Sequence, residues 1–404
     1  MTKMIRSLFQ CFFVCRMRKL QKRKSCFASL PVDVITEIFV RLPMKSVLIC
    51  RCVCKYWNTF IYDSNFAKLL FTYTPTCTMI RHLHSGIFHL VEYDRIEWHE
   101  RRNNPLCCSV FEVLDPNSNN SIKLDPKFEI PIPDPKSIQG RRVYVDVLSC
   151  NGLFYLSCSM DRDISLVCNP ITGEFIRLPK QPPILRPYEQ ISWGFGFHPK
   201  TNQYKVMRIY IFKHDRRMVV EMHTVGTSTW INIEVDYPKN LIHVLNHSAY
   251  FNGALHWIGI DVDGNDSIWA FNFDTERFQS FSMPPKDQGT KVRIFEFRGS
   301  LCLIYFNDLL VTMWMMKRYG DGKSWAPIFQ YTNSSITTSQ LPSCIGSLDR
   351  KNQEFRIFVT PWCDFKAHGK FQIIHHVPTL IPLKDIIIGD NVEVQNIYSP
   401  DNPN

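Results

Sequence analysis

The sequence contains no set of residues arranged as catalytic machinery requires. It lacks the phosphate-binding patterns G-x-x-x-x-G-K-S/T and G-x-G-x-x-G, the nucleophile elbow G-x-S-x-G and the zinc motif H-E-x-x-H. The closest match, Gly194-Phe-Gly196-Phe, lies in a strand-like context with no helix after it, so we interpret its glycines as a packing or bulge feature. The sequence therefore predicts no catalytic residue and no cofactor.

Histidines and cysteines are numerous but poorly spaced for a metal site. The 13 histidines include two close pairs, His82/His84 and His375-His376. Neither pair has a cysteine or carboxylate beside it at ligand spacing. Cys50, Cys52 and Cys54 would point to different faces of a helix, so we interpret them as core thiols. We expect no metal site, and the 15 cysteines, odd in number and without a C-x-x-C pair, favour a reducing compartment.

The net charge of +10 is concentrated at the N-terminus. Residues 1–28 hold eight Lys and Arg and no acid, which leaves +2 (10 minus 8) for the remaining residues. We therefore expect no nucleic-acid partner for the folded body, and we predict a disordered leader. A nuclear-import signal or a patch that touches acidic membrane or nucleic acid are the alternatives for this leader.

No segment has the length of a membrane span or the form of a signal peptide. The apolar stretch of the leader, residues 8–15, is short and runs directly into basic residues. The stretch that comes closest, Leu301 to Met316, is broken by Asn307-Asp308 and is short of the roughly 20 residues that a bilayer requires. We expect no membrane partner and a cytoplasmic or nuclear location.

Composition and spacing predict a small helical domain followed by a larger β domain. The chain of 404 residues has 13% aromatic residues, and its 25 Pro outnumber its 17 Gly, which favours many short strands. Near residue 72 the apolar spacing changes from helical period to short β-branched and aromatic runs. We predict a leader at 1–28, a helical domain at 29–71, a β domain at 72–385 and a C-terminal tail at 386–404.

Three short helices are predicted in residues 29–71. Ser29, Pro31 and Asp33 are helix-start signals, and Pro43 ends the first helix. A second helix begins at Lys45-Ser46. The third carries an apolar stripe made of Val53, Tyr56, Trp57, Phe60 and Ile61. Such a small unit buries little apolar surface, so we expect an exposed face that binds a partner; the alternative is that the stripe packs on the β domain.

The β region contains a repeat of about 50 residues. A Thr followed three residues later by an aromatic recurs at Thr172/Phe175, Thr227/Trp230 and Thr275/Phe278, with a weaker copy at Gly322/Trp325. Asn-Gly pairs at 151–152 and 252–253, and Arg298-Gly299 as a partial match, give a similar period. This is the blade length of kelch-type propellers and predicts around six blades. The pair Thr201/Tyr204 does not fit this register, and a two-sheet β-sandwich is the alternative.

The helical domain resembles the F-box. The match consists of Leu30-Pro31, a second Leu-Pro pair twelve residues later, Lys45-Ser46, and a closing Cys54-Lys-x-Trp57. The region from about 140 to 330 resembles the F-box-associated domain of plant F-box proteins, through residues 169–179, 194–197, 204–206 and 252–257. The second resemblance supports a kelch-like β architecture.

Together these resemblances imply the substrate-recognition subunit of a Skp/cullin/F-box (SCF) ubiquitin ligase. Such a receptor is non-catalytic: the F-box binds a Skp-type adaptor and, through it, cullin, while the β domain recruits a target protein for ubiquitination and degradation. The implied adaptor-binding residues are Leu30, Pro31, Ile35, Ile38, Leu42, Pro43, Val53 and Trp57. Ile49 and Cys50 replace a common Arg-Phe pair, so reduced adaptor affinity is expected.

Two other classes of function compete with this one. A carbohydrate- or small-ligand-binding β-propeller acting outside a ligase would use exposed Trp and Tyr on its loops. A propeller enzyme such as a metal-dependent oxidase ranks below both. In the ligase interpretation the target surface is expected on loops at one face of the β domain, and its residues are unknown.

Overall fold

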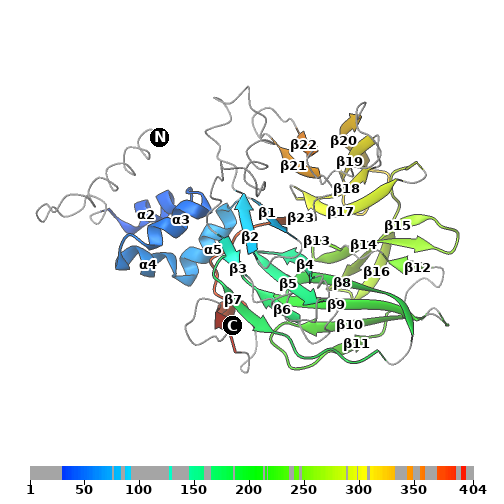
Figure 1. Cartoon of the computed structure of the whole chain (residues 1–404), viewed down its shortest axis with the longest axis horizontal. Coiled ribbons are helices and arrows are strands. Elements are labelled where there is room, and N and C mark those ends of the chain that lie inside the picture. The colour runs from blue at the N-terminus through cyan, green and yellow to red at the C-terminus, as the bar shows by residue number, and fades with distance from the viewer. Residues whose placement is uncertain are drawn as a thin grey trace, which may run out of the picture. The chain divides into compact units, whose positions relative to one another are not determined.

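The computed structural model describes residues 30–74, 77–82, 87–91, 127–129, 145–158, 165–184, 187–212, 214–215, 217–235, 241–244, 248–287, 290–297, 299–306, 310–332, 344–348, 355–359, 371–387 and 393–396. The α-helices of this part of the chain lie in the first range, and strands make up most of the others (Figure 1). The leader at 1–28 and His84 fall outside the described residues. No helix within them is long and apolar enough to cross a bilayer.

Four helices follow one another in residues 30–74. They are α2 (Val32–Phe39), α3 (Met44–Arg51), α4 (Lys55–Ile61) and α5 (Ser64–Tyr73). The first two begin alike, because each follows a Leu-Pro pair whose proline is the N-cap residue with a ψ of 148°. The carbonyl oxygens of Pro31 and Pro43 each accept two N–H groups of the following turn. The two Leu-Pro pairs thus start two helices, and Ser29, predicted as a helix-start signal, lies outside the described residues.

Side chains cap the other two helices. The Sγ of Cys54 accepts a hydrogen bond from the Trp57 N–H at 3.5 Å. The Oδ1 of Asp63 accepts the N–H groups of Asn65 and Phe66 at 3.0 and 3.1 Å. The sequence predicts three helices and a turn at 62–65, but Asp63 in that turn also begins α5. The fourth helix is therefore an addition to the predicted set.

The described strands form six antiparallel sheets, which we number as blades. Blade 1 contains β4 (Val145–Cys150), β5 (Leu153–Cys158), β6 (Ser165–Cys168), β7 (Glu174–Arg177) and β24 (Gln395–Asn396). Blade 2 contains β8 (Tyr188–His198), β9 (Gln203–Phe212), β10 (Met218–Thr224) and β11 (Ile231–Ile233). Blade 3 contains β12 (Leu241–Val244), β13 (Ala249–Phe251), β14 (Ala254–Asp261), β15 (Asp266–Asn272) and β16 (Arg277–Phe281).

The remaining sheets complete the series. Blade 4 contains β17 (Lys291–Phe297), β18 (Ser300–Phe306), β19 (Leu310–Met316) and β20 (Trp325–Thr332). Blade 5 contains β21 (Cys344–Leu348) and β22 (Phe355–Val359). Blade 6 contains β23 (Phe371–His376), β1 (Cys77–His82), β2 (Ile87–Val91) and β3 (Lys127–Glu129). Blade 6 therefore joins a strand from the C-terminal part of the chain to three strands that precede blade 1.

Neighbouring blades contact each other chiefly through the first strands of each sheet. β23 contacts β4, β4 contacts β8, β8 contacts β13, and β13 contacts β17. This radial series of antiparallel sheets is a β-propeller, so the propeller prediction is confirmed over the β-sandwich alternative. The six sheets of the described residues agree with the number of blades that the sequence repeat predicts.

The two repeat markers correspond to two different corners of a blade. The Thr/aromatic pairs lie at the β6–β7, β10–β11 and β15–β16 corners, and Gly322/Trp325 lies at the β19–β20 corner. The Asn-Gly pairs lie at β4–β5 and β13–β14, where all four residues have positive φ between 41° and 84°. Thr201/Tyr204 lies at β8–β9, which is the corner of the Asn-Gly pairs, and this explains why it breaks the register.

The hydrophobic core lies between successive blades. Tyr155 of blade 1 packs with Phe195 of blade 2, and Met207 of blade 2 packs with Trp257 of blade 3. The motif Gly194-Phe-Gly196-Phe lies on β8 in this layer. A Cβ at Gly194 would stand 2.7 Å from both Leu255 Cδ1 and Trp257 Cζ2, so the glycine permits close packing between blades, as predicted.

The segment that follows β23 crosses blade 1. The amide nitrogen of Asn169, at the β6–β7 corner, donates to the carbonyl oxygens of Thr379 and Ile381 at 3.1 and 3.3 Å. The Leu383 N–H donates to the carboxylate of Glu174 at 2.9 Å. Residues 395 and 396, in the segment predicted as a C-terminal tail, then pair as β24 with β7. We call the described parts of this segment, residues 377–387 and 393–396, the strap.

Candidate docking surfaces

The structure divides the eight predicted adaptor-binding residues by their exposure. Pro31, Pro43 and Val53 are exposed, whereas Leu30, Ile38 and Leu42 are partly buried. Ile35 and Trp57 are buried, with 0% and 7% of their surface exposed. Ile35 is a buried residue of α2 and Trp57 a buried residue of α4, so each would support an adaptor surface rather than form its outer layer.

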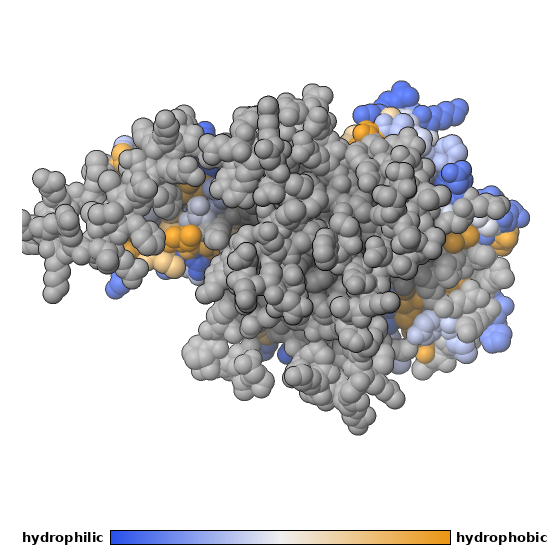
Figure 2. Space-filling view, turned by 45° about the horizontal axis from the view of Figure 1, so that its top comes forward, coloured by the Kyte–Doolittle hydropathy of each residue, from blue (hydrophilic) through white to orange (hydrophobic). Residues whose placement is uncertain are grey.

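Exposed apolar side chains are concentrated on the helices. Among the described residues eleven large apolar side chains are exposed, and eight of them lie between residues 32 and 73. These eight are Val32, Val34, Ile49, Val53, Tyr56, Tyr62, Leu69 and Tyr73. Where the helical segment is visible at the left of Figure 2, orange apolar surface lies beside blue polar surface. Exposed apolar residues at this frequency along one segment of the chain favour a protein-binding role for that segment.

Sequence reasoning found only part of this apolar set. Of the eight, Val53 is the single one among the predicted adaptor-binding residues. Val32 and Val34 precede and follow Asp33 in the first turn of α2, and both are exposed although Ile35 and Phe39 of the same helix are buried. Val32 stands three residues before Ile35 and seven before Phe39, so helical periodicity places it on their face and does not predict its exposure.

The positions that depart from the common F-box pattern differ in exposure. Ile49 is exposed, while Cys50 is buried and burial raises its thiol pKa to about 11. The adjacent Arg51 places its guanidinium 4.0 Å from the centre of the Tyr62 ring. An apolar Ile49 side chain therefore faces outward at the position where an arginine is common.

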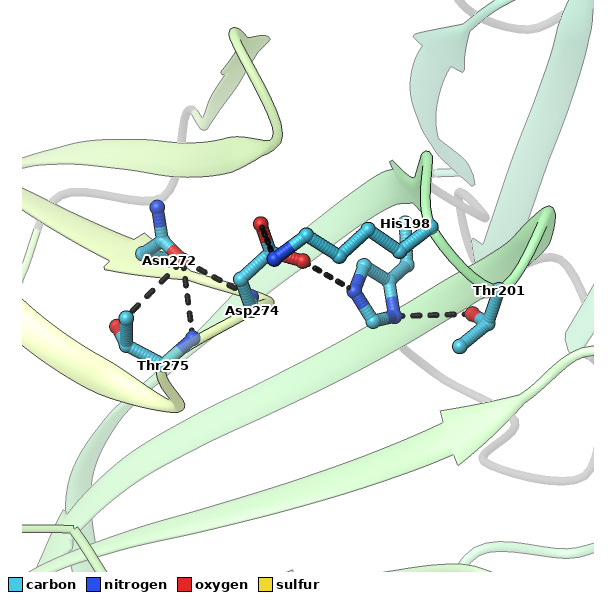
Figure 3. A network of polar contacts seen from close by, with 6 residues as sticks. His198, Thr201, Asn272, Asp274 and Thr275 are labelled. Carbon is cyan, nitrogen blue, oxygen red and sulfur yellow. Dashed lines mark hydrogen bonds and ion pairs between the residues drawn. The ribbon is translucent and has the colours of Figure 1, made fainter.

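A polar network joins blades 2 and 3 (Figure 3). The Nε2–H of His198, at the end of β8, donates to Asp274 Oδ1 at 2.6 Å. The other ring nitrogen accepts the Thr201 hydroxyl at 2.9 Å. The Lys200 ammonium binds Asp274 Oδ2 at 3.0 Å. Hydrogen bonds from Lys200 and His198 lower the pKa of Asp274, so the carboxylate stays ionised at neutral pH.

The order hydroxyl, imidazole, carboxylate is also that of a hydrolytic triad. Here the Asp274 carboxylate is 34% exposed and shares its charge with the Lys200 ammonium. Thr201 lies on the turn that directly follows His198 and orients the imidazole, while the contacts of His198 and Lys200 with Asp274 fasten that turn to the β15–β16 corner. We therefore assign the network to holding two blades together.

Asn272 shapes the corner that this network holds. Its Oδ1 accepts the N–H groups of Asp274 and Thr275 at 2.9 and 3.1 Å. In Figure 3 the amide nitrogen of Asn272 points away from the network. This side chain can therefore donate a hydrogen bond to an additional group.

A second polar cluster is enclosed within the propeller. The guanidinium of Arg208 forms an ion pair with Glu221 and donates to the Pro182 carbonyl oxygen at 2.8 Å. The rings of Trp193 and Trp230 each lie 5.9 Å from the guanidinium carbon. Arg208 is 1% exposed, so the cluster anchors the connection from blade 1 to blade 2 and offers no surface to a ligand.

Comparison with known proteins identifies the class of this chain. The family model described as the F-box associated beta propeller domain matches residues 101–344, more than half of the chain, and the F-box-like model matches residues 27–72. The chain therefore belongs to the F-box proteins that carry an F-box associated β-propeller domain. It combines an N-terminal helical F-box with a β-propeller, as the resemblances imply.

Relatives of similar architecture occur in Arabidopsis thaliana. F-box protein At2g23160 is 24% identical over 291 residues, which cover 69% of this chain and 86% of that protein. F-box/kelch-repeat protein At3g23880 is 22% identical over 309 residues, which cover 74% of this chain and 79% of that protein. The six-bladed lectin of Aleuria aurantia aligns at 10% identity over 59% of this chain and 79% of the lectin, with a TM-score of 0.32.

Family membership has consequences at the level of the class. F-box proteins of this family are generally non-catalytic adaptors, and an F-box implies binding of a Skp-type adaptor. The role implied for this chain is that of a substrate adaptor in an SCF ligase.

Proposed function

We propose that this protein is the substrate-recognition subunit of an SCF ubiquitin ligase. Its F-box binds a Skp-type adaptor that connects it to cullin, and its propeller recruits a target protein for ubiquitination and degradation. The observation that carries the proposal is the concentration of eight exposed large apolar side chains between residues 32 and 73. All of them except Tyr73 lie within residues 27–72, which the F-box-like model matches. The chain acts in the cytoplasm or nucleus.

The mechanism is tethering. A receptor that holds the target and the ligase scaffold at once converts ubiquitin transfer into a reaction within one complex, at a high effective concentration of target lysines. The residues of this chain then bind and orient, and bond making is left to the ubiquitin-charged enzyme. The division into 1–28, 29–71, 72–385 and 386–404 assigns adaptor binding to the second segment and target binding to the third.

The adaptor surface has an outer layer and a supporting layer. Pro31, Pro43 and Val53 contact the adaptor directly, together with the partly buried Leu30, Ile38 and Leu42. Ile35 and Trp57 are buried in α2 and α4, so they contribute to binding by holding their own helices in shape. Ile49 adds apolar area but lacks the donors of an arginine, so adaptor affinity is lower than with the common pattern.

Co-purification of the full chain with a co-expressed Skp-type adaptor tests the proposal. Val53→Asp places a charge in the outer layer and should weaken the complex about tenfold or more, since a carboxylate would be desolvated on binding. Ile231→Asp is the matched control, because Ile231 is exposed to a similar extent (51% against 44% for Val53) but lies on blade 2. The double variant Leu30→Ala, Pro31→Ala should also lose the complex.

Two outcomes would contradict the proposal. One is a folded wild-type chain that forms no adaptor complex. The other is equal loss of binding in Val53→Asp and Ile231→Asp, which would show that the charge acts without regard to position. Far-ultraviolet circular dichroism of each variant establishes that the chain is folded.

A further inference from the structure

The strap shows how this propeller binds an extended segment at the corner of a blade. Thr379 and Leu383 are almost completely buried on blade 1. Asn169 provides the central contact: its Oδ1 shapes the β6–β7 corner, and its amide nitrogen donates to two strap carbonyl oxygens. Beyond the corner, Gln395 and Asn396 pair with Phe175 and Glu174 as an added strand on the outer edge of β7.

Blade 3 repeats this corner. Asn272, Thr275 and Phe278 have the same spacing as Asn169, Thr172 and Phe175. Asn272 Oδ1 accepts two backbone N–H groups of its corner as Asn169 Oδ1 does. The corresponding corners of blades 2 and 4 have no asparagine at this place, so within the four corners that the structure describes in full, blade 3 holds the second copy.

On blade 3 no segment of the described residues lies on this corner as the strap does on blade 1. The amide nitrogen of Asn272 has no partner among the described residues and points away from the network in Figure 3. β16 is the last strand of its sheet, so its outer edge pairs with no described strand. Arg277, Gln279 and Ser280 on β16 are exposed. A row of free backbone N–H and C=O groups at a sheet edge is a template for an added strand.

Beside the β15–β16 corner of blade 3, the β13–β14 turn is already covered by blade 2. Thr379 of the strap lies against Gly152 on blade 1, and on blade 3 the corresponding Gly253 faces Pro199 from the β8–β9 turn. That turn is fastened to the corner through His198 and Asp274. A ligand on blade 3 would therefore occupy only the outer part, from Asn272 along β16, on a corner whose conformation is fixed before binding.

The two corners differ at one position, and the residue that blade 3 has there indicates the chemistry of the ligand. Glu174 accepts the Leu383 N–H of the strap on blade 1, and blade 3 has Arg277 at that place. Arg277 is exposed and forms no ion pair within the described residues. A guanidinium cannot accept an N–H but binds a carboxylate through two parallel hydrogen bonds.

We propose that the outer edge of blade 3 binds an extended, acidic peptide segment of a partner protein by strand addition. Asn272 donates to a backbone carbonyl oxygen of the segment, β16 pairs with its backbone, and Arg277 binds an Asp or Glu side chain. The assignment of this segment to the ubiquitination target rests on the proposed function. The binding surface itself does not.

A labelled peptide that copies residues 381–396 is the probe. It carries three acidic residues and one lysine, a net charge of −2 (1 minus 3), and its sequence already binds a corner of this type. Fluorescence anisotropy with the full-length protein should show saturable binding. Arg277→Glu and Asn272→Ala should each weaken it tenfold or more, whereas Arg277→Lys should retain most of it. Lys323→Glu, the same charge reversal at the blade 4 corner, is the matched control and should leave binding unchanged.

Hydrogen exchange locates the bound peptide. Protection of residues 277–281 on peptide binding supports the proposal, and protection of residues 174–177 instead would mean that the peptide displaces the native strap. Three results would overturn the proposal. They are protection of residues 174–177, absence of saturable binding, and binding that Arg277→Glu does not weaken. Adaptor co-purification with the same variants is a separate readout, so failure of the ligase assignment and failure of this surface are distinguishable.

Discussion

At the scale of single residues, a buried histidine makes the propeller sensitive to acid. Nδ1–H of His256 on β14 donates to the Ala249 carbonyl oxygen at 3.2 Å, so Nε2 accepts the Tyr319 hydroxyl at 2.9 Å. Burial lowers the pKa of His256 to about 4. Because the unfolded chain takes up its proton near pH 6.5, the unfolded state binds more protons than the folded state below that pH.

The free energy of unfolding should therefore be fully retained above pH 6.5 and fall as the pH decreases toward 4. For His256 alone the loss amounts to roughly 3 kcal/mol. His256→Gln should flatten this part of the profile in urea titrations at successive pH values. Burial also lowers the pKa of His376, to about 3, so some acid sensitivity should remain in the variant. An unchanged slope in His256→Gln would contradict the assignment.

Gly194 offers a second prediction at this scale. A side chain there would overlap Leu255 and Trp257 of the next blade. Gly194→Ala should lower the free energy of unfolding by about 1–3 kcal/mol, the usual cost of overpacking. Urea denaturation measures the change, and Ser280→Ala, at an exposed position on β16, serves as the comparison. An effect at Gly194 no larger than that at Ser280 would show that the blades separate easily.

At the scale of elements, the two asparagine corners can be compared directly. Asn169→Ala removes two turn hydrogen bonds and two hydrogen bonds to the strap, whereas Asn272→Ala removes turn bonds only. At about 1 kcal/mol for each bond, Asn169→Ala should be the more destabilising by about 2 kcal/mol. Denaturant midpoints of the two variants test this difference. Equal midpoints would mean that the strap contributes nothing through Asn169.

How far the sequence predicts these elements depends on how local their cause is. Pro31 and Asn151-Gly152 set backbone geometry by themselves, so the helix start and the hairpin turn that they predict are present in the structure. Pro43, predicted only as the end of the first helix, is also the N-cap of α3, which begins one residue before the predicted Lys45-Ser46. β24 is two residues long and exists because β7 offers an edge, and no pattern in Gln395-Asn396 indicates this. The exposure of Val53 beside the burial of Trp57 likewise depends on packing that periodicity does not specify.

At the scale of the whole molecule, the propeller is closed by pairing its two ends. β23 and β1 form a six-residue antiparallel register from Cys77↔His376 to His82↔Phe371. β23 also contacts β4, the strand at which blade 1 begins. Without β23, blade 6 and blade 1 would each lose their neighbour, and the ring would have two open edges. Cooperative unfolding of the propeller therefore depends on residues near the C-terminus.

Truncations of the full chain separate the contribution of this closure from that of the strap's final strand. A chain ending at residue 370 lacks β23 and should lose its single cooperative unfolding transition and aggregate, because long-range pairing can no longer close the ring. A chain ending at residue 392 lacks only β24 and should keep one transition at a slightly lower denaturant midpoint. Circular dichroism and size-exclusion chromatography distinguish these outcomes. If the shorter chain unfolded like the longer one, blade 6 would not close the propeller, and the stability of the ring would have to come from contacts within each pair of successive blades.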